Sequence, residues 1–197
     1  EEGLKKAYET FESWGQVYIK SSSQGSSIGC YFIKEKKELK EKLEKAFKLS
    51  PYVLLEKPIK GRELEMAAYE WEGNLIVTAP AEIITPSTAF YSFEEKYSQE
   101  SQTETYVKAK NLEQDLIDQM KEIAKRAFKL LKIKDLSRID FFLDENNQLY
   151  INEINTFPGM TPISLFPKMM EENGHRFKDF LEEKIRENTR KRNNHEA

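Results

Sequence analysis

The chain has 197 residues, with 31 Lys and Arg against 34 Asp and Glu and a formal net charge of −3. This balance excludes a nucleic-acid-binding protein that depends on bulk positive charge, and 12 Phe, 9 Tyr and 2 Trp argue against a disordered chain. A single Cys excludes an internal disulfide framework, the first segment does not read as a signal peptide, and no apolar run approaches the roughly 20 residues of a membrane helix.

Helical and strand patterns alternate along the chain. Apolar residues at helical spacing predict helices at Glu1–Ser13, Lys36–Leu49, about 112–131, Leu165–Glu172 and Phe177–Arg190. Short apolar runs predict strands at Gln16–Lys20, Tyr52–Glu56, Arg62–Trp71, Asn74–Thr78, Ser137–Leu143 and Gln148–Ile154, with Cys30 at the start of another. Turn residues at 72–74 and 144–147 predict two hairpins. This mixture indicates an α+β fold with antiparallel sheets rather than a doubly wound parallel sheet.

Two segments in the first third of the chain could bind an anion or a nucleotide. In Lys20–Gly29, a strand ending in Lys20 runs into a loop of Ser and Gly, which can turn backbone N–H groups toward an anion. A polar hairpin loop with a solvated lysine explains the same residues, and the GK[ST] ending of a Walker A loop is missing. In the second segment, Glu56 and Glu63 could accept hydrogen bonds from an adenine amine or a ribose, or lie in a charged surface loop.

The most specific pattern runs from Arg138 to Thr161. In a strand, Arg138 and Asp140 share one face, and Glu153 and Asn155 share one face of the strand that follows. The predicted hairpin brings Asp140 close to Glu153 and Asn155, and oxygen ligands of these types suit Mg²⁺, so that Arg138 beside them would face an anion. The alternative is a solvated polar face, but like charges rarely pair across a ladder without a counter-ion.

Three further residues are ambiguous or uninformative. Ser164 could cap the helix that follows it, or it could present its hydroxyl to a ligand. His175 and His195 fall in a predicted turn and in the tail, and no catalytic triad or metal-binding His pair can be built from them.

In this order, the segments resemble the ATP-grasp family and, within it, the D-alanine–D-alanine ligases. The resemblance covers most of the chain from about Tyr18 to Gly174, and it is carried by Tyr18–Gly29, Leu55–Glu65, Phe90–Tyr97, Arg138–Thr161 and Ile163–Pro167. It implies ATP-dependent ligation of two D-alanines through an acyl phosphate, for peptidoglycan precursor synthesis in the cytoplasm. The implied cofactors are ATP and two Mg²⁺, with Mn²⁺ as a possible substitute. The implied partners are D-alanine and a second copy, without nucleic acid or membrane.

The resemblance also implies roles for single residues. ATP-binding residues would be Lys20, Gly25, Ser27, Glu56, Lys57, Ile59, Glu63 and Lys96. Metal ligands would be Asp140, Glu153 and Asn155, and Ser164 would engage the carboxylate of the second D-alanine. Arg138 and the Gly159 N–H would stabilise the oxyanion of the tetrahedral intermediate. Ser26 and Tyr97 would form a hydrogen-bonded link that holds the Gln24–Gly29 loop closed.

The chain departs from the family in what it lacks. Family members carry an N-terminal domain before the matching region, which supplies a carboxylate for the first D-alanine, a second ATP-binding lysine and the dimer interface. We therefore expect a fragment: a partial small subdomain at 1–60, a C-terminal subdomain at 61–190 with a lid loop at 85–106, and a frayed tail at 191–197. Alone, it is expected to bind ATP weakly, if at all, and to form no dipeptide.

Two other functions stay open. One keeps the fold but changes the substrate, as in a D-alanine–D-lactate, D-alanine–D-serine or other carboxylate–amine ligase. The depsipeptide-forming relatives lack the Lys96-Tyr97 pair, so its presence favours a dipeptide product. The other is a non-catalytic ATP-binding module, and the presence of Arg138 and of all three expected metal ligands counts against it.

Overall fold

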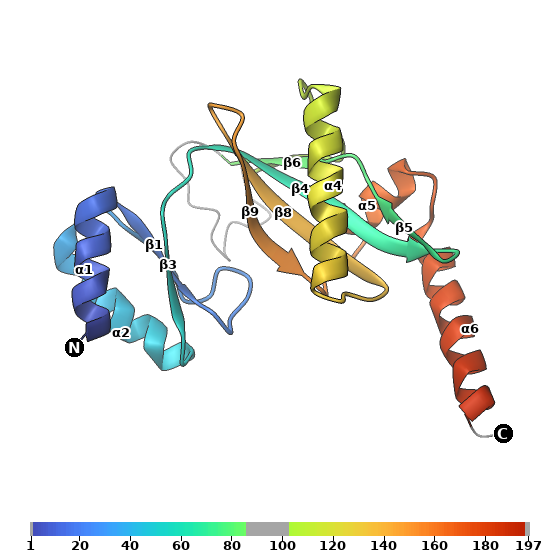
Figure 1. Ribbon diagram of the computed structural model, residues 1–197, viewed down its shortest axis with the longest axis horizontal. Coiled ribbons are helices and arrows are strands. Elements are labelled where there is room, and N and C mark those ends of the chain that lie inside the picture. Colours follow the sequence, from blue (N-terminus) through green and yellow to red (C-terminus); the bar gives the residue numbers. More distant parts are fainter. Residues whose placement is uncertain (1, 86–102, 196–197) are drawn as a thin grey trace. The chain divides into compact units, whose positions relative to one another are not determined.

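The computed structural model describes residues 2–85 and 103–195 of the chain (Figure 1). The described backbone divides into two compact units, one formed by residues 2–60 and the other by 61–84 with 104–195. Helices and antiparallel strands occur in both units, as the sequence pattern predicts.

The first unit is a small three-stranded sheet covered by two helices. Its elements are α1 (Glu2–Trp14), β1 (Val17–Ser21), β2 (Cys30–Ile33), a 3-10 turn (Lys36–Glu38), α2 (Leu39–Leu49) and β3 (Val53–Glu56). β1 lies in the middle and pairs antiparallel with β2 and β3. Apolar residues of both helices, among them Phe11 and Leu43, pack on the face of β1 that carries Val17 and Ile19. This alternation leaves Lys20 on the opposite face.

The second unit is built on a six-stranded antiparallel sheet. Its elements are β4 (Gly61–Trp71), β5 (Asn74–Val77), β6 (Ala81–Ile84), β7 (Glu104–Tyr106), α4 (Gln114–Leu130), β8 (Leu136–Asp144), β9 (Leu149–Asn155), α5 (Leu165–Glu172) and α6 (Phe177–His195). The strands follow the order β7-β6-β4-β8-β9, and β5 also pairs with β4. Figure 1 shows α4 lying across the sheet.

The long central strand β4 has two different faces. Leu64 and Met66 belong to the apolar core that α4 completes with Met120 and Phe128. The alternate residues face the other way, where the ring of Tyr69 packs against rings of α5 and α6. The two faces of the sheet are therefore covered differently: α4 packs on one, and α5 and α6 pack on the other.

Tyr69 also fixes the turn between α5 and α6. Its hydroxyl lies 2.7 Å from His175 Nδ1 and accepts a hydrogen bond of 3.2 Å from Asn173 Nδ2. Burial raises the pKa of the Tyr69 hydroxyl, which therefore stays protonated. Since His175 also stacks on Trp71 at 4.5 Å between ring centroids, the turn is held on β4 by both polar and aromatic contacts.

Some elements differ from the prediction. β6 was not predicted, and β7 falls inside the stretch that was expected to be a loop. The three residues of β7 are Glu-Thr-Tyr, which carry no apolar alternation, so this strand exists through its pairing with β6 rather than through its own sequence. α6 continues past Arg190, its predicted end, to His195. Within the described residues, no helix is long and apolar enough to cross a membrane.

The backbones of β4 and β8 lie very close together at Gly61, which predicts that a side chain there would lower stability. A Cβ on Gly61 would lie 2.0 Å from the carbonyl oxygen of Leu143, so Gly61→Ala must push β4 and β8 apart. We expect this variant to lose about 2–3 kcal/mol of unfolding free energy, measured by urea denaturation. Gly3→Ala adds the same methyl group in α1 where nothing lies within 4 Å, and it should cause no loss. Equal stability of the two variants would contradict the close packing of β4 on β8.

Candidate functional site

The β8–β9 hairpin contains one extra residue. Asp140 pairs with Glu153 across the ladder, whereas Phe141 pairs with Ile151, so Asn152 is the additional residue of a β-bulge. A bulge bends its strand and re-aims the side chains that follow. The hairpin is therefore not a simple period-2 ladder at the point where the predicted metal ligands lie.

The bulge decides which face of the sheet these ligands reach. Leu149 and Ile154 both pack against the core under α4, although they are five positions apart and an unbroken strand would place them on opposite faces. After the bulge, Glu153 and Asn155 therefore point away from α4, to the face on which the polar residues of β8 lie. Without the extra residue they would be directed into the apolar core.

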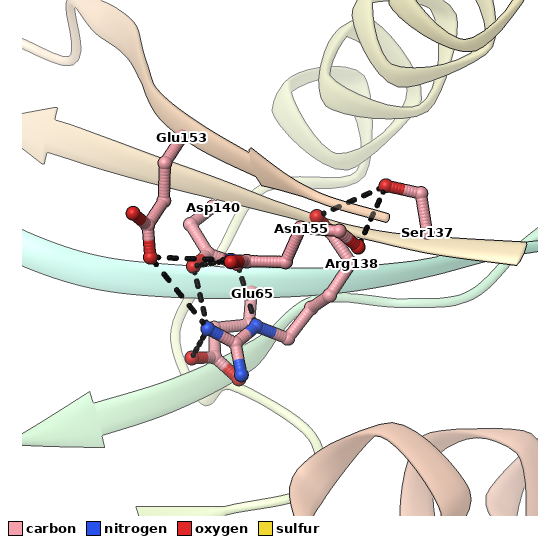
Figure 2. Close-up of polar contacts among 6 residues, drawn as sticks. All are labelled: Glu65, Ser137, Arg138, Asp140, Glu153 and Asn155. Carbon is pink, nitrogen blue, oxygen red and sulfur yellow. Dashed lines mark hydrogen bonds and ion pairs between the residues drawn. The ribbon is translucent and has the colours of Figure 1, made fainter. Parts of the chain in front are cut away.

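Arg138 lies at the centre of the polar side chains on this face (Figure 2). Its Nε and Nη2 donate two hydrogen bonds, of 2.8 and 2.7 Å, to the two carboxylate oxygens of Asp140. Nη2 also lies 3.2 Å from Oε1 of Glu65 and 3.9 Å from Oε1 of Glu153. The amide of Asn155 closes the group by donating to Asp140 at 3.0 Å and to Glu153 at 3.1 Å. The predicted proximity of Asp140, Glu153 and Asn155 is confirmed.

Two of these carboxylates are removed from water. Glu65 is 4% exposed and Asp140 is 2% exposed, whereas the side chain of Glu153 is 52% exposed. Burial, the largest effect, raises the pKa of Asp140, and the hydrogen bonds and charge of Arg138 act in the opposite direction. Burial also opposes the charge of Arg138, but its hydrogen bonds to Asp140 and the nearby carboxylates outweigh this and raise its pKa. One guanidinium against three carboxylates leaves the group with two negative charges when all are ionised.

This excess of negative charge suits a divalent cation. The expected ligands are two carboxylates and one amide, which are the hard oxygen donors that Mg²⁺ binds. The amide of Asn155 currently presents its nitrogen to both carboxylates, so it must turn to offer its oxygen to a cation. Within the described ranges, no group of three or more His, Cys, Asp or Glu side chains is arranged to hold a metal.

The loop between β9 and α5 brings two more predicted residues together. A Cβ on Gly159 would lie 2.8 Å from the hydroxyl oxygen of Ser164. Ser164 occupies the N-cap position of α5, but its side chain makes no capping hydrogen bond. Instead, its hydroxyl accepts a hydrogen bond from the Thr161 backbone N–H at 3.2 Å and contacts the Thr161 hydroxyl at 2.8 Å. Of the two roles that the sequence left open for Ser164, capping through the side chain is therefore wrong.

In the first unit, the base of the serine-rich loop is anchored on the end of α2. Ser50 is buried, with 3% of its surface exposed. Its hydroxyl contacts the hydroxyls of Ser22 at 3.0 Å and Ser23 at 2.8 Å. At the tip of the loop, Ser26 and Ser27 both have left-handed backbone conformations, with φ of 53° and 62°. Such strain in residues with a Cβ is typical of ligand-binding loops.

Of the two glycines in this loop, only Gly29, at its end, stands where a larger residue would not fit. Gly29 has a φ of 70°, and a Cβ there would lie 2.4 Å from the Ser21 hydroxyl and 2.9 Å from a Leu49 methyl group. At Gly25, by contrast, a Cβ would meet nothing within 4 Å. Gly29 thus fixes the path of the loop back into β2, and Gly25 leaves open space beside the backbone.

Lys20 and Glu56 contact each other across the sheet. Lys20 Nζ lies 2.6 Å from Glu56 Oε2, on the face of the β1–β3 pair that the helices leave open. The two residues are about one-third exposed, so a ligand could reach both. Beyond Glu56, Lys57 is exposed and Ile59 is half-buried.

The described residues thus place the predicted site residues in two groups. Lys20, Gly25, Ser26, Ser27, Glu56, Lys57 and Ile59 belong to the first unit; Glu63, Arg138, Asp140, Glu153, Asn155, Gly159 and Ser164 belong to the second. Lys96 and Tyr97 lie outside the described residues.

Glu65 is the residue of this site that sequence reasoning missed. It follows Glu63 by two positions in β4 and therefore lies on the same face of the strand. Directly opposite it in the β4–β8 ladder is Asp140. The alternation Glu63, Glu65 beside a predicted metal ligand could have indicated its position, but the pairing of β4 with β8 was not predictable from local sequence.

Comparison with known proteins gives consistent matches along nearly the whole chain. Residues 5–186 match the family described as D-ala D-ala ligase C-terminus. A D-alanine–D-alanine ligase of Vibrio parahaemolyticus is 51% identical over 185 residues, which are 94% of this chain and 56% of that protein. One of Tolumonas auensis is 51% identical over 181 residues, which are 92% of this chain and 55% of that protein.

Solved structures also match. D-alanyl-alanine synthetase A from Vibrio cholerae matches with a TM-score of 0.83 and 47% identity over 91% of this chain and 54% of that one. VanG, a D-Ala:D-Ser ligase from Enterococcus faecalis, matches with a TM-score of 0.76 and 30% identity over 90% of this chain and 51% of that one. These neighbours confirm the predicted α+β fold. The chain spans about half the length of the relatives it matches.

The position of Arg138 among the carboxylates predicts how its removal changes stability, and how that change depends on pH. Arg138→Met leaves two buried carboxylates without their counter-ion, and it should cost about 3–5 kcal/mol of unfolding free energy near neutral pH. Without the guanidinium, burial holds the pKa of Asp140 still further above its value in the unfolded chain. The folded variant then binds a proton more readily than the unfolded chain, so the loss should shrink as the pH falls from about 8 to about 5.5.

Urea denaturation at several pH values measures this effect. Arg176→Met removes an arginine from a surface pair with Asp179, and its cost should stay below about 0.5 kcal/mol at every pH. A loss in Arg138→Met that grows on acidification would contradict the described charge balance.

Proposed function

Because this chain belongs to the D-ala D-ala ligase C-terminus family and so has the ATP-grasp fold, we propose that it forms the ATP- and metal-binding part of a D-alanine–D-alanine ligase. The observation that carries this proposal is the group around Arg138. There, one guanidinium, two acidic ligand candidates and an amide share one face of a sheet. This arrangement supplies oxygen ligands for a cation and a positive charge for phosphate in the same place.

In the proposed reaction, a D-alanine carboxylate attacks the γ-phosphate of ATP, and ADP leaves. The deprotonated amine of a second D-alanine then attacks the carbonyl carbon of the acyl phosphate, and the tetrahedral intermediate collapses to the dipeptide with loss of inorganic phosphate. Divalent cations held by Asp140, Glu153 and Asn155 would neutralise phosphate charge. Arg138 would direct its guanidinium to the transferred phosphoryl group and, with the Gly159 N–H, stabilise the oxyanion of the tetrahedral intermediate. Ser164 would bind the carboxylate of the second D-alanine.

The first unit would contribute to nucleotide binding. The strained tip of the loop, with Gly25, Ser26 and Ser27, offers backbone N–H groups to phosphate while the base stays fixed on α2. Lys20, Glu56, Lys57 and Ile59 of this unit would bind the nucleotide. Glu63, at the start of β4, is assigned to nucleotide binding on the strength of its sequence resemblance. Lys96 and Tyr97 complete the proposed set on the strength of their sequence resemblance.

The subdomain division, the partners and the cellular setting belong to the same proposal. We assign 1–60 to a small subdomain and 61–190 to the C-terminal subdomain, with a lid loop between β6 and β7. The expected lid at 85–106 and tail at 191–197 are each too long, because 104–106 form β7 and 191–195 continue α6. Since the chain spans only about half of its relatives, the complete ligase would need further residues for the first D-alanine. It would act as a cytoplasmic homodimer in peptidoglycan precursor synthesis, with two Mg²⁺ ions, which Mn²⁺ could replace.

The match to VanG favours one alternative. That protein is a D-Ala:D-Ser ligase, and it shares the fold of this chain with 30% identity. The residues proposed to hold metal and phosphate do not choose between D-alanine and D-serine as the second substrate. This choice depends on contacts to the side chain of the second substrate.

The metal assignment predicts the effect of a single oxygen-to-nitrogen change. Glu153→Gln, in the protein expressed from its complete reading frame, should lower dipeptide formation and phosphate release by more than about a hundredfold, because a metal ligand is lost. Glu145→Gln changes an exposed carboxylate in the turn of the same hairpin and should keep activity within about twofold. Turnover of Glu153→Gln equal to that of Glu145→Gln would refute the assignment.

Product analysis tests the choice of second substrate. The same protein, given ATP, Mg²⁺ and an equimolar mixture of D-alanine, D-serine and D-lactate, should form D-alanyl-D-alanine as its main product. We expect the dipeptide to exceed the depsipeptide because Lys96-Tyr97 is present. Mass spectrometry of the products distinguishes the three, and a majority of D-alanyl-D-serine would favour the alternative instead.

A further inference from the structure

Glu65 is a buried carboxylate that contacts the guanidinium of Arg138, and the proposed reaction gives Glu65 no role. It lies 4% exposed in β4, directly opposite Asp140 of β8. Its Oε1 is 3.2 Å from Arg138 Nη2. Figure 2 shows the Arg138 guanidinium between Glu65 and the polar residues of β8 and β9.

Arg138 is therefore held by two buried carboxylates of different strands. Asp140 accepts a hydrogen bond from Nε and one from Nη2, at 2.8 and 2.7 Å, and Glu65 lies slightly farther from the same Nη2. As long as Asp140 keeps both hydrogen bonds, Glu65 adds little to the position of the guanidinium. The two carboxylates differ, however, in what else they must do.

A cation at Asp140 changes this balance. An oxygen of Asp140 that binds a divalent cation has fewer lone pairs left for Arg138, and the cation itself repels the guanidinium. A long arginine side chain in this position would otherwise move away from the site toward solvent. Glu65 cannot follow it, because it is enclosed in the central strand of the sheet.

We propose that Glu65 is a positioning residue, which retains Arg138 beside the site when a divalent cation occupies Asp140 and so keeps the guanidinium directed at phosphate. The inference rests on the proposed function for the cation and the phosphate. It assigns to Glu65 no contact with substrate or metal. The two carboxylates that bind the same arginine would therefore have different roles: Asp140 binds the cation, and Glu65 holds Arg138 in place.

A second buried pair in the same sheet provides a matched control. Glu82 of β6 is 8% exposed and accepts hydrogen bonds of 2.7 and 2.8 Å from Nε and Nη2 of Arg62. Glu82→Gln and Glu65→Gln both replace a buried carboxylate that faces an arginine by an amide of the same shape. A purely structural role would make the two variants behave alike.

The experiment follows Arg138 directly, in the protein expressed from its complete reading frame and labelled with ¹⁵N-arginine. The Nε–H resonance of Arg138 is assigned by its loss in Arg138→Lys. We expect it to be sharp in wild type, Glu82→Gln and Glu65→Gln without Mg²⁺, since Asp140 holds it in all three. On addition of Mg²⁺ it should stay sharp in wild type and Glu82→Gln and broaden beyond detection in Glu65→Gln, because the released N–H exchanges with water.

Kinetics give a second readout on the same variants. Glu65→Gln should lower kcat at saturating ATP and Mg²⁺ by at least about tenfold while the KM for ATP changes less than about threefold, and Glu82→Gln should keep kcat within about twofold. Thermal unfolding checks that both are folded. If Glu65→Gln does not fold, Glu65→Asp replaces it, because a shorter carboxylate keeps the charge but cannot hold the guanidinium at the same distance.

The outcomes separate this inference from the proposed function. A sharp Arg138 resonance in Glu65→Gln with Mg²⁺, or equal kcat values for Glu65→Gln and Glu82→Gln, would overturn the role of Glu65 while dipeptide formation by wild type still stands. Failure of wild type to form the dipeptide, with the Mg²⁺-dependent difference intact, would overturn the ligase function and support the role of Glu65. In wild type the Arg138 resonance should stay sharp but change its chemical shift when Mg²⁺ binds beside it. A chemical shift that does not change with Mg²⁺ would overturn the metal assignment together with this role.

Discussion

A single guanidinium contacts three carboxylates on one face of a β-sheet and neutralises only part of their charge, and the arrangement of the second unit depends on these contacts. Glu65 and Asp140 are buried, so neither can rely on water to stabilise its charge. Arg138 reaches both because β4 and β8 are direct neighbours. The remaining negative charge is exposed only at Glu153, where a cation can approach from solvent. A site that is electrostatically incomplete in this way would need only a local change, such as a turn of the Asn155 amide, to accept a divalent cation.

The two units prepare for a ligand in different ways. In the second, the polar residues project from strands whose opposite face is packed under α4, so their positions are set by the core. In the first, the candidate anion-binding groups lie on a loop. Its base is fixed by the buried Ser50 hydroxyl, and only the tip around Ser26 and Ser27 departs from ordinary backbone conformations. Rigid strands suit a metal and a catalytic charge, whereas a pinned loop suits a phosphate that must enter and leave.

Local sequence was sufficient to predict the turns of the hairpins and the faces of single strands. The turn residues at 72–74 and 144–147 predicted both hairpins, and alternation placed Arg138 and Asp140 on one face. It failed where distant pairing decides: β7 has no strand signal of its own, and Glu65 acquires its meaning only from β8 beside it. The bulge lies between these cases, since the apolar residues of β9 change from a spacing of two to a spacing of three after Ile151. Geometry such as the sharing of Nη2 between two carboxylates has no counterpart in the sequence.

The bulge at Asn152 lies on a terminal strand of the sheet, which bears on contacts with other chains. β9 is the last strand on its side of the sheet within the described part of the chain, and it exposes Tyr150 and Ile151. A straight edge strand with apolar side chains is a template for intermolecular pairing and aggregation. The extra residue interrupts the regular row of backbone groups, and the charge of Glu153 follows at once. The extra residue that orients the candidate ligands would therefore also reduce strand pairing between molecules at this edge. Selection for solubility and selection for the site would then act on one residue, Asn152.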